Sequence, residues 1–227
     1  MENELNLIRV INKPLNWTSF DVCNYLKREY PRKTKIGHAG TLDPLATGVL
    51  VVAIGKATKT IDTIQAQKKE YIATVTFGAS TPTYDAEFYP ELINPTPGLT
   101  KSIILNSIMK YKGLILQTPP VYSALKINGK KAYELARAGK EVEMKAREVT
   151  VYENELLEFS QKDNITIIKL RIECSKGTYI RSIAHDLGQD LGCGAFLSGL
   201  VRTRVGEYTI QEAEDIKSDQ NEISANQ

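Results

Sequence analysis

Hydrophobic and polar residues alternate along several segments of the chain, and this period of two is typical of half-buried β-strands. In residues 70–77 an apolar or aromatic residue occupies every odd position from Tyr71 to Phe77, and Gly78 follows. Residues 49–54 form a continuous apolar run that also predicts a strand. Weaker patterns predict strands at 121–127, 147–159, 165–174 and 204–210.

Apolar residues at helical spacing, together with terminal signals, predict four helices. Thr18 offers a hydroxyl cap to the first helix, and Pro31 ends it. The predicted helices cover about 18–29, 100–112, 132–138 and 180–191. Strands and helices interleave irregularly, which favours an α+β fold with a mixed sheet over a regular parallel sheet.

The composition excludes several classes of protein. The chain has 227 residues, 42% of them hydrophobic and 25% charged, as in a globular protein of one large domain or of one domain with a small appendage. Its longest apolar run is much shorter than the roughly 20 residues that cross a bilayer, and its acidic start lacks the charge of a signal peptide. We therefore expect a cytoplasmic protein without a membrane partner. The spacing of Cys23, Cys174 and Cys193 predicts buried thiols rather than a disulfide framework or a zinc cluster.

The net charge of +2 hides an uneven distribution. Residues 207–227 contain six acidic residues and one basic residue, so the first 206 residues carry a net charge of +7. Within that part, basic residues gather at 27–35 and at 126–147. Such clusters suit a polyanion, because each phosphate contact releases condensed counterions. A solvated helix face is the alternative explanation of either cluster.

The loop at 37–48 is the most informative segment. It contains three glycines and Pro44, which biases Asp43 away from the helical region and can present its carboxylate on a fixed loop. A nucleophile or a general base needs this rigid presentation. The alternative is an Asx-turn, in which Asp43 bonds its own backbone.

Other candidate residues each have an ordinary structural alternative. Arg181, in the first turn of its predicted helix, could hold a carboxylate across a cleft or could be a surface arginine. Tyr71 could stack on a base or could be a core tyrosine. His38 and His185 lack a second ligand at metal spacing, so no metal site is expected. The absence of P-loop and GxGxxG motifs disfavours nucleotide hydrolysis and dinucleotide redox chemistry.

The chain also contains six longer motifs. They are 37–48 (GHAGTLDPLATG), 69–71 (KEY), 81–87 (TPTYDAE), 117–126 (QTPPVYSALK), 177–187 (GTYIRSIAHDL) and 200–206 (LVRTRVG). In their order and their amino-acid sequences they resemble the motifs of the bacterial tRNA pseudouridine synthase B family, over about residues 8–210. The resemblance is specific, because several long motifs agree in the same order.

The resemblance implies an activity, a fold and a partner. The family converts the uridine at position 55, in the TΨC loop of tRNA, to pseudouridine, and it needs neither cofactor nor metal. The implied fold is α+β, with a mixed, largely antiparallel central sheet flanked by helices. The basic segment 121–147 resembles the mobile thumb that closes on RNA. The implied partner is the T-arm stem-loop of tRNA, with no obligatory protein partner, and we expect a monomer.

The resemblance also assigns roles to individual residues. Asp43 resembles the catalytic aspartate, Arg181 the arginine that pairs with it, and Tyr71 the tyrosine that stacks against the target base. Lys13, followed by Pro14, matches a Lys-Pro pair for which a structural role is expected. The other substrate-binding positions are the pocket-lining Tyr179 and Leu200 and the loop-supporting His38.

The chain departs from the family pattern in two respects. Where the family usually reads TDTxDAEG, residues 81–88 read TPTYDAEF, so that Pro82 and Phe88 replace an acid and a glycine. Longer members add a C-terminal RNA-binding domain, which we expect to be missing here. Residues 1–210 are predicted as the catalytic domain, and 211–227 as an acidic, mobile tail.

Three functions are open at this point. In pseudouridine formation, Asp43, kept ionised by Arg181, either attacks the flipped-out nucleotide or removes a proton from its sugar. The second possibility is a non-catalytic RNA-binding or RNA-chaperone protein that uses the same basic surface. The third is an aspartate-dependent glycosidase acting on nucleosides, which would leave both basic clusters unexplained.

Overall fold

The computed structural model divides into two compact units. The first is formed by Met1–Gln67 and Val201–Gln227, and the second by Lys68–Leu200. The structure describes residues 5–92, 95–96, 98–127, 129–162 and 165–216. Most of the predicted acidic tail, residues 217–227, therefore lies outside the described residues.

The first unit is built on two long strands, β1 (Asn6–Lys13) and β3 (Ala46–Gly55), and all of β1 pairs antiparallel with residues 48–55 of β3. From a later part of the chain, β14 (Glu214–Asp215) runs parallel to β1 and pairs with Ile11 and Asn12. The other elements of this unit are α1 (Ser19–Lys27), β2 (Ile36–His38), η1 (Lys56–Thr60), α2 (Ile61–Ala66), β13 (Tyr208–Thr209), η2 (Ile210–Glu212) and β14 (Glu214–Asp215).

The continuous apolar run of β3 is buried on both of its faces. Leu50 and Val52 pack in one cluster with Leu26 of α1, whereas Val49 and Val51 belong to a second cluster with residues of η2, α2 and β13 packed around it. A strand that is covered on both sides needs no polar positions, which explains why its sequence does not alternate.

The second unit contains a sheet in the order β12-β4-β11-β10-β7, in which β4 and β11, β11 and β10, and β10 and β7 pair antiparallel. β12 (Ala195–Val205) begins in this unit and ends in the first. The remaining elements are β4 (Lys69–Phe77), β5 (Ala79–Ser80), β6 (Glu91–Leu92), α3 (Lys101–Met109), β7 (Gly113–Gln117), β8 (Lys126–Ile127), β9 (Lys130–Lys131), α4 (Ala132–Arg137), β10 (Arg147–Lys162), β11 (Ile165–Cys174) and α5 (Ile180–Asp190).

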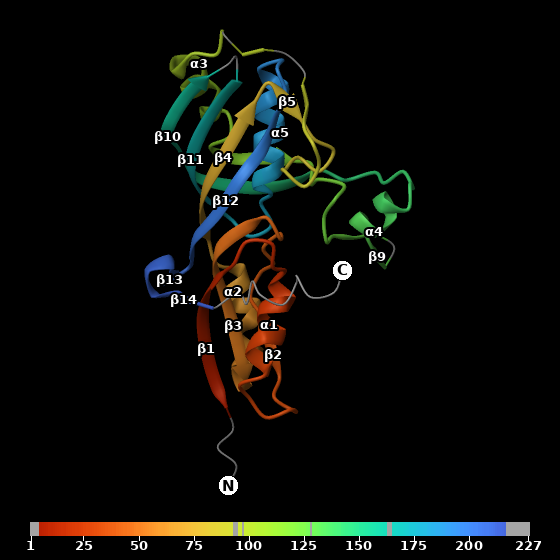
Figure 1. The fold of residues 1–227 in the computed structure, drawn as a ribbon, viewed down its shortest axis with the longest axis vertical. Helices are drawn as coiled ribbons and strands as arrows, with labels where there is room; N and C mark the ends of the chain where they lie inside the picture. Colours follow the sequence, from red (N-terminus) through yellow and green to blue (C-terminus); the bar gives the residue numbers. More distant parts are fainter. Residues whose placement is uncertain (1–4, 93–94, 97, 128, 163–164, 217–227) are drawn as a thin grey trace, which may run out of the picture. The chain divides into compact units, whose positions relative to one another are not determined.

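The alternation predicted for 70–77 is confirmed in β4. The side chains from Tyr71 to Phe77 at odd positions are buried, and those between them are partly exposed. The predicted helix at 180–191 is confirmed as α5, which contacts β4 and buries Ile183 and Leu187. In Figure 1 α5 runs along the strands of this unit.

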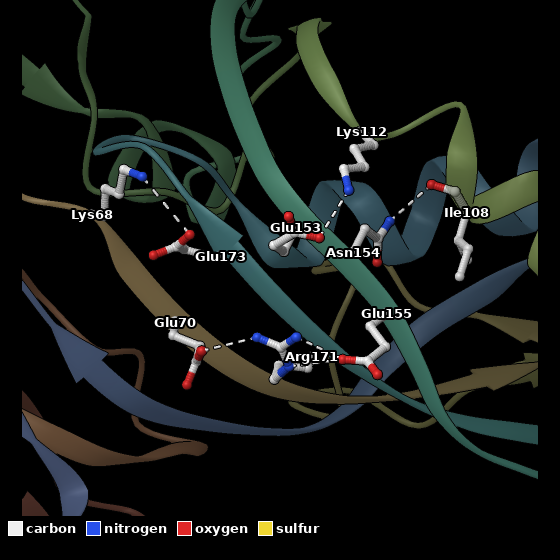
Figure 2. A network of polar contacts seen from close by, with 9 residues as sticks. All are labelled: Lys68, Glu70, Ile108, Lys112, Glu153, Asn154, Glu155, Arg171 and Glu173. Carbon is white, nitrogen blue, oxygen red and sulfur yellow. Dashed lines mark hydrogen bonds and ion pairs between the residues drawn. The ribbon is translucent and has the colours of Figure 1, made fainter.

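The opposite face of this sheet carries ion pairs between neighbouring strands (Figure 2). Arg171 of β11 lies between Glu70 of β4 and Glu155 of β10, with nitrogen-to-oxygen distances of 3.3 and 2.7 Å. Exposed ion pairs contribute at most ~1 kcal/mol each, so they help to fix strand register rather than supply most of the stability. Glu70 precedes Tyr71, whose side chain points to the other face of the sheet.

A basic excursion, residues 121–147, leaves the sheet after β7 and returns at the start of β10. Its helix α4 and strand β9 stand clear of the sheet in Figure 1. The strand predicted for 121–127 is wrong for 121–125, because only Lys126 and Ile127 find a partner strand. Upstream of them the backbone turns, with the Ser123 N–H bonded to the Val121 carbonyl at 2.9 Å.

The strand predicted for 204–210 is wrong in its bounds. β12 already begins at Ala195, and the chain reverses after Val205 so that β13 pairs back with β12. Gly206 has a φ of +56° at this two-residue turn, where a positive φ suits glycine.

Two predictions from composition can be compared with the structure. Cys23, Cys174 and Cys193 are buried, as predicted. Among the described residues, no helix is long and apolar enough to span a bilayer.

A substitution at Gly48 tests how closely the loop at 37–48 packs against the backbone of Arg202. Its φ is +98°, and an added Cβ would lie 2.2 Å from the carbonyl oxygen of Arg202. We expect Gly48→Ala to lower the free energy of unfolding by about 3 kcal/mol or more, as measured by urea denaturation. Gly113→Ala is the matched control, because its φ of +95° is similar and no atom lies within 4 Å of the added Cβ. Backbone strain alone should cost about 1–2 kcal/mol there, and equal losses in both variants would contradict the close approach at Gly48.

Candidate active site

Asp43 lies on the loop between β2 and β3, and hydrogen bonds hold the residues on either side of it. On one side, the Leu42 N–H donates to Ser19 Oγ (2.9 Å), which donates to the Leu42 carbonyl (3.2 Å). On the other side, the Pro44 carbonyl accepts from the Asn16 N–H (2.9 Å). The half-buried Asp43 is therefore carried by a short segment that is fixed at both ends.

The backbone at Asp43 forms a turn. The Ala46 N–H donates to the Asp43 carbonyl at 3.0 Å, with Pro44 at the second position of the turn, where its fixed φ is favourable. Residues 41–43 are not helical. The non-helical presentation predicted from the Asp43-Pro44 sequence is confirmed.

A buried lysine supports the same turn. Lys13, at the end of β1, has no exposed surface and donates from Nζ to the carbonyls of Pro14, Trp17 and Pro44 at 2.8, 2.6 and 3.2 Å. Burial lowers the pKa of Lys13 to about 8, against the opposing effect of the nearby Asp43 carboxylate. The Lys-Pro pair of the sequence thus places an amine next to the loop that carries Asp43.

Arg202, a residue of β12, donates hydrogen bonds to the backbone on both sides of Asp43. Its buried guanidinium donates from Nε to the Val49 carbonyl (2.7 Å) and from Nη2 to the Gly40 carbonyl (3.1 Å). Burial and the charge of Arg202 both lower the pKa of His38. His38 is therefore neutral at pH 7, and its Nδ1 is buried without a hydrogen-bond partner in the part of the chain that the structure describes.

In the second unit, Arg181 and Asp85 form a buried ion pair with an Nη1-to-Oδ2 distance of 3.4 Å. Arg181 Nη1 also donates to the Thr83 carbonyl (3.1 Å), and Asp85 Oδ1 accepts from Thr83 Oγ1 (2.6 Å) and the Glu87 N–H (3.0 Å). Only 6% of the Arg181 side chain and 9% of the Asp85 side chain are exposed. The alternative of a surface arginine is therefore wrong.

The sequence alone does not indicate a role for Asp85. The available signal was its place in the TPTYDAE motif, but nothing in the sequence linked it to Arg181, which lies far along the chain. Asp43 and Arg181 belong to different units, and their pairing stays a prediction.

An aromatic stack fixes the loop of Asp85 to α5. The ring of Tyr84 lies 3.8 Å from that of His185, at an angle of 11° between the planes, and His185 is one helical turn after Arg181. Tyr84 has a φ of +65°, and its carbonyl accepts from the Leu197 N–H at 2.9 Å. Burial lowers the pKa of His185, so the stacked imidazole is neutral at pH 7.

The remaining predicted site residues also lie in the second unit. Tyr71 is the third residue of β4 and is buried, with 9% of its surface exposed. Tyr179 is the N-cap residue of α5 and Leu200 lies on β12, and both are half-buried. Their contacts with a base stay predictions. Among the described residues, no group of three His, Cys, Asp or Glu side chains could hold a metal ion.

Two domain families match the chain. The N-terminal domain of the TruB family of pseudouridylate synthases matches residues 27–180, and the C-terminal domain of tRNA pseudouridylate synthase B matches residues 181–223. The chain belongs to the TruB family. The resemblance that the six motifs indicated is confirmed.

Relatives from the TruB family are similar to this chain over most of their length. The tRNA pseudouridine synthase B of Parabacteroides distasonis is 50% identical over 208 residues, which are 89% of this chain and 87% of that protein. The protein of the same name in Phocaeicola vulgatus is 47% identical over 222 residues, 93% of either chain.

Solved structures of larger assemblies contain a similar fold. One is an H/ACA ribonucleoprotein bound to a substrate RNA containing 2′-deoxyuridine, with a TM-score of 0.66 and 26% identity over 92% of this chain and 50% of that chain. Another is a Cbf5–Nop10–Gar1 complex, with a TM-score of 0.68 and 27% identity over 94% of this chain and 53% of that chain. The chain spans about half the length of these solved chains. The predicted α+β fold with a mixed sheet is confirmed.

We expect Asp85→Ala to lower the free energy of unfolding by about 3–5 kcal/mol, because Arg181 loses a carboxylate while staying buried. Glu87→Ala is the control. It removes an exposed partner of Arg137, 2.7 Å away, and should cost less than about 1 kcal/mol. Urea denaturation measures both, and similar losses would contradict a stabilising role of the buried pair.

The lowered pKa of Lys13 predicts a stability that depends on pH. Between pH 8 and 10.5, the unfolded chain binds more protons at Lys13 than the folded chain, so the contribution of Lys13 to stability rises with pH. From pH 7 to 10.5 the free energy of unfolding, relative to Lys13→Met, should rise by up to about 3 kcal/mol. Urea denaturation at a series of pH values checks this.

Lys27→Met, at the exposed end of α1, controls for the loss of a surface charge. A difference between the native chain and Lys13→Met that stays constant with pH would rule out a depressed pKa at Lys13.

Proposed function

We propose that the chain isomerises the uridine at position 55, in the TΨC loop of tRNA, to pseudouridine. The observation that carries this proposal is the fixed, half-buried Asp43 in a member of the TruB family. Relatives that bear the name tRNA pseudouridine synthase B are 47–50% identical over about nine-tenths of the chain. Because substrate and product are isomers, the proposed reaction needs no external source of energy, and the resemblance to the family implies that it uses no cofactor.

The reaction moves one bond between the base and the sugar. The N1–C1′ bond breaks, the released uracil rotates, a C5–C1′ bond forms, and the hydrogen on C5 leaves as a proton while N1 gains one. Asp43 serves either as the nucleophile at C1′ or as the base that removes a proton from the sugar.

The other predicted site residues serve the base and the loop. Tyr71 holds the detached uracil, and Tyr179 and Leu200 line its pocket. Arg181, which is in a buried ion pair with Asp85, also supplies the guanidinium that keeps Asp43 ionised. His38 supports the loop.

RNA binding follows from the two basic clusters. Flipping a nucleotide out of a folded loop costs a few kcal/mol, which stacking and phosphate contacts offset. In the cluster at 27–35 the one acidic residue, Glu29, lies 2.6 Å from Arg9, which offsets its negative charge. The basic excursion supplies further cations. We therefore assign the T-arm stem-loop of tRNA as the partner of a monomeric chain, with residues 1–210 as the catalytic part.

Asp43→Asn tests the assignment. We expect the release of tritium from tRNA that carries 5-tritiated uridine to fall at least about 10³-fold, with binding of the tRNA changed by no more than about twofold. Asp62→Asn, on the exposed side of α2 in the same unit, is the matched control and should keep its activity.

Each alternative gives a different result in this assay. Native rates from purified Asp43→Asn would exclude Asp43 as nucleophile or base. A native chain that binds tRNA without releasing tritium would favour an RNA-binding or chaperone function, and free uracil would favour a glycosidase. Transcripts of whole tRNA and of the isolated T-arm, compared side by side, test the assigned partner.

A further inference from the structure

The two ends of the basic excursion are neighbours in the sheet. Gln117 is the last residue of β7, Arg147 is the first residue of β10, and the two are register partners. The excursion leaves after one and returns at the other, and its helix α4 stands clear of the sheet (Figure 1). A displacement of the excursion would therefore act on the sheet where Gln117 and Arg147 pair.

Gln117 binds the backbone of Tyr179 on both sides. Its side-chain oxygen accepts from the Tyr179 N–H (2.8 Å), and its side-chain nitrogen donates to the Tyr179 carbonyl (3.1 Å). Gln117 has only 1% of its surface exposed, so water does not compete for these bonds. The next residue, Thr118, accepts at its carbonyl from Ser182 Oγ (2.8 Å), in the first turn of α5.

Arg147 contacts the ring of Tyr179 and the turn before it. Its guanidinium carbon lies 5.1 Å from the centre of the ring, within the range of a cation–π interaction. Its Nη2 donates to the Gly177 carbonyl. The ends of the excursion thus hold both the backbone and the ring of Tyr179.

The held segment leads directly to the buried ion pair. Tyr179 caps α5, and Arg181 lies two residues later in the first turn, where it meets Asp85. A displacement of residues 177–179 would move the start of the helix that carries Arg181. Since misplacement by about 1 Å can cost about 100-fold in rate, contacts this close to the pocket can set the rate.

We propose that Gln117 and Arg147 are positioning residues, which hold Tyr179 in the uridine pocket and couple its placement to RNA bound on the basic excursion. This inference rests on the proposed function, because that function places RNA on the excursion and uridine at Tyr179. If Arg147 were instead one more phosphate-binding cation, its loss would weaken RNA binding without changing the rate of the bound complex.

Arg147→Lys separates these two roles, because it keeps the positive charge and loses the planar face over Tyr179. We expect kcat for tritium release from tRNA to fall about 10-fold, with KM within about twofold. Lys145→Ala, two residues earlier in the same excursion, removes a cation and should raise KM with kcat unchanged. If Arg147→Lys changes only KM, or changes nothing, Arg147 is not a positioning residue.

A double-mutant cycle tests whether the effect acts through Tyr179. In a Tyr179→Phe background the ring remains, and Arg147→Lys should still lower kcat. In a Tyr179→Leu background it should lower kcat no further. Gln117→Met, which removes both bonds to the Tyr179 backbone, should also lower kcat about 10-fold. Thermal melting confirms that each variant is folded, and additive losses in the cycle would overturn the inference.

A readout without turnover separates this inference from the proposed function. With 3-fluorotyrosine placed at position 179, T-arm RNA should shift the fluorine resonance, and Arg147→Lys should remove at least about half of the shift. If the native chain shows this coupling but releases no tritium, the proposed reaction fails, whereas the coupling of Tyr179 to RNA bound on the excursion stands. If the native chain is active and RNA moves the resonance equally in both proteins, the inference fails and the proposed reaction stands.

Discussion

Two positive charges buried in the first unit determine where Asp43 is held. Lys13 and Arg202 have almost no exposed surface, and a buried cation is costly unless hydrogen bonds replace its water. Both side chains find these bonds at backbone carbonyls of residues around Asp43, including those of Gly40 and Pro44. The loop cannot leave this position without stripping a buried cation of its partners, so one loop conformation is favoured over the rest.

The sequence predicts those elements whose burial follows a simple period. The alternation of β4, the apolar run of β3 and the stripe of α5 each report a local environment, and each element is present. The segment 121–125 is apolar in part but has no partner strand, so its sequence could not reveal that the backbone turns. Pairing depends on residues far along the chain, and a window of a few residues does not contain them.

The same limit applies to the candidate site. Pro44 and the glycines around Asp43 are local signals, and they correctly predicted a fixed, non-helical loop. The burial of Arg181 was not predictable, because an arginine in the first turn of a helix is usually exposed. Its partner Asp85 arrives from a distant loop that the Tyr84–His185 stack holds against α5. The sequence motifs located these residues along the chain, whereas the ion pair between Arg181 and Asp85 forms only in the folded protein.

β14 pairs with β1 only at Ile11 and Asn12, beside the ion pair between Arg9 and Glu214. The open side of a strand presents unpaired N–H and C=O groups to any other extended chain. These two residues of β14 occupy that side, and the charged side chains next to them make the site unattractive to an apolar strand. A short pairing near the end of the described chain thus covers the last part of β1, where an extended chain could otherwise add.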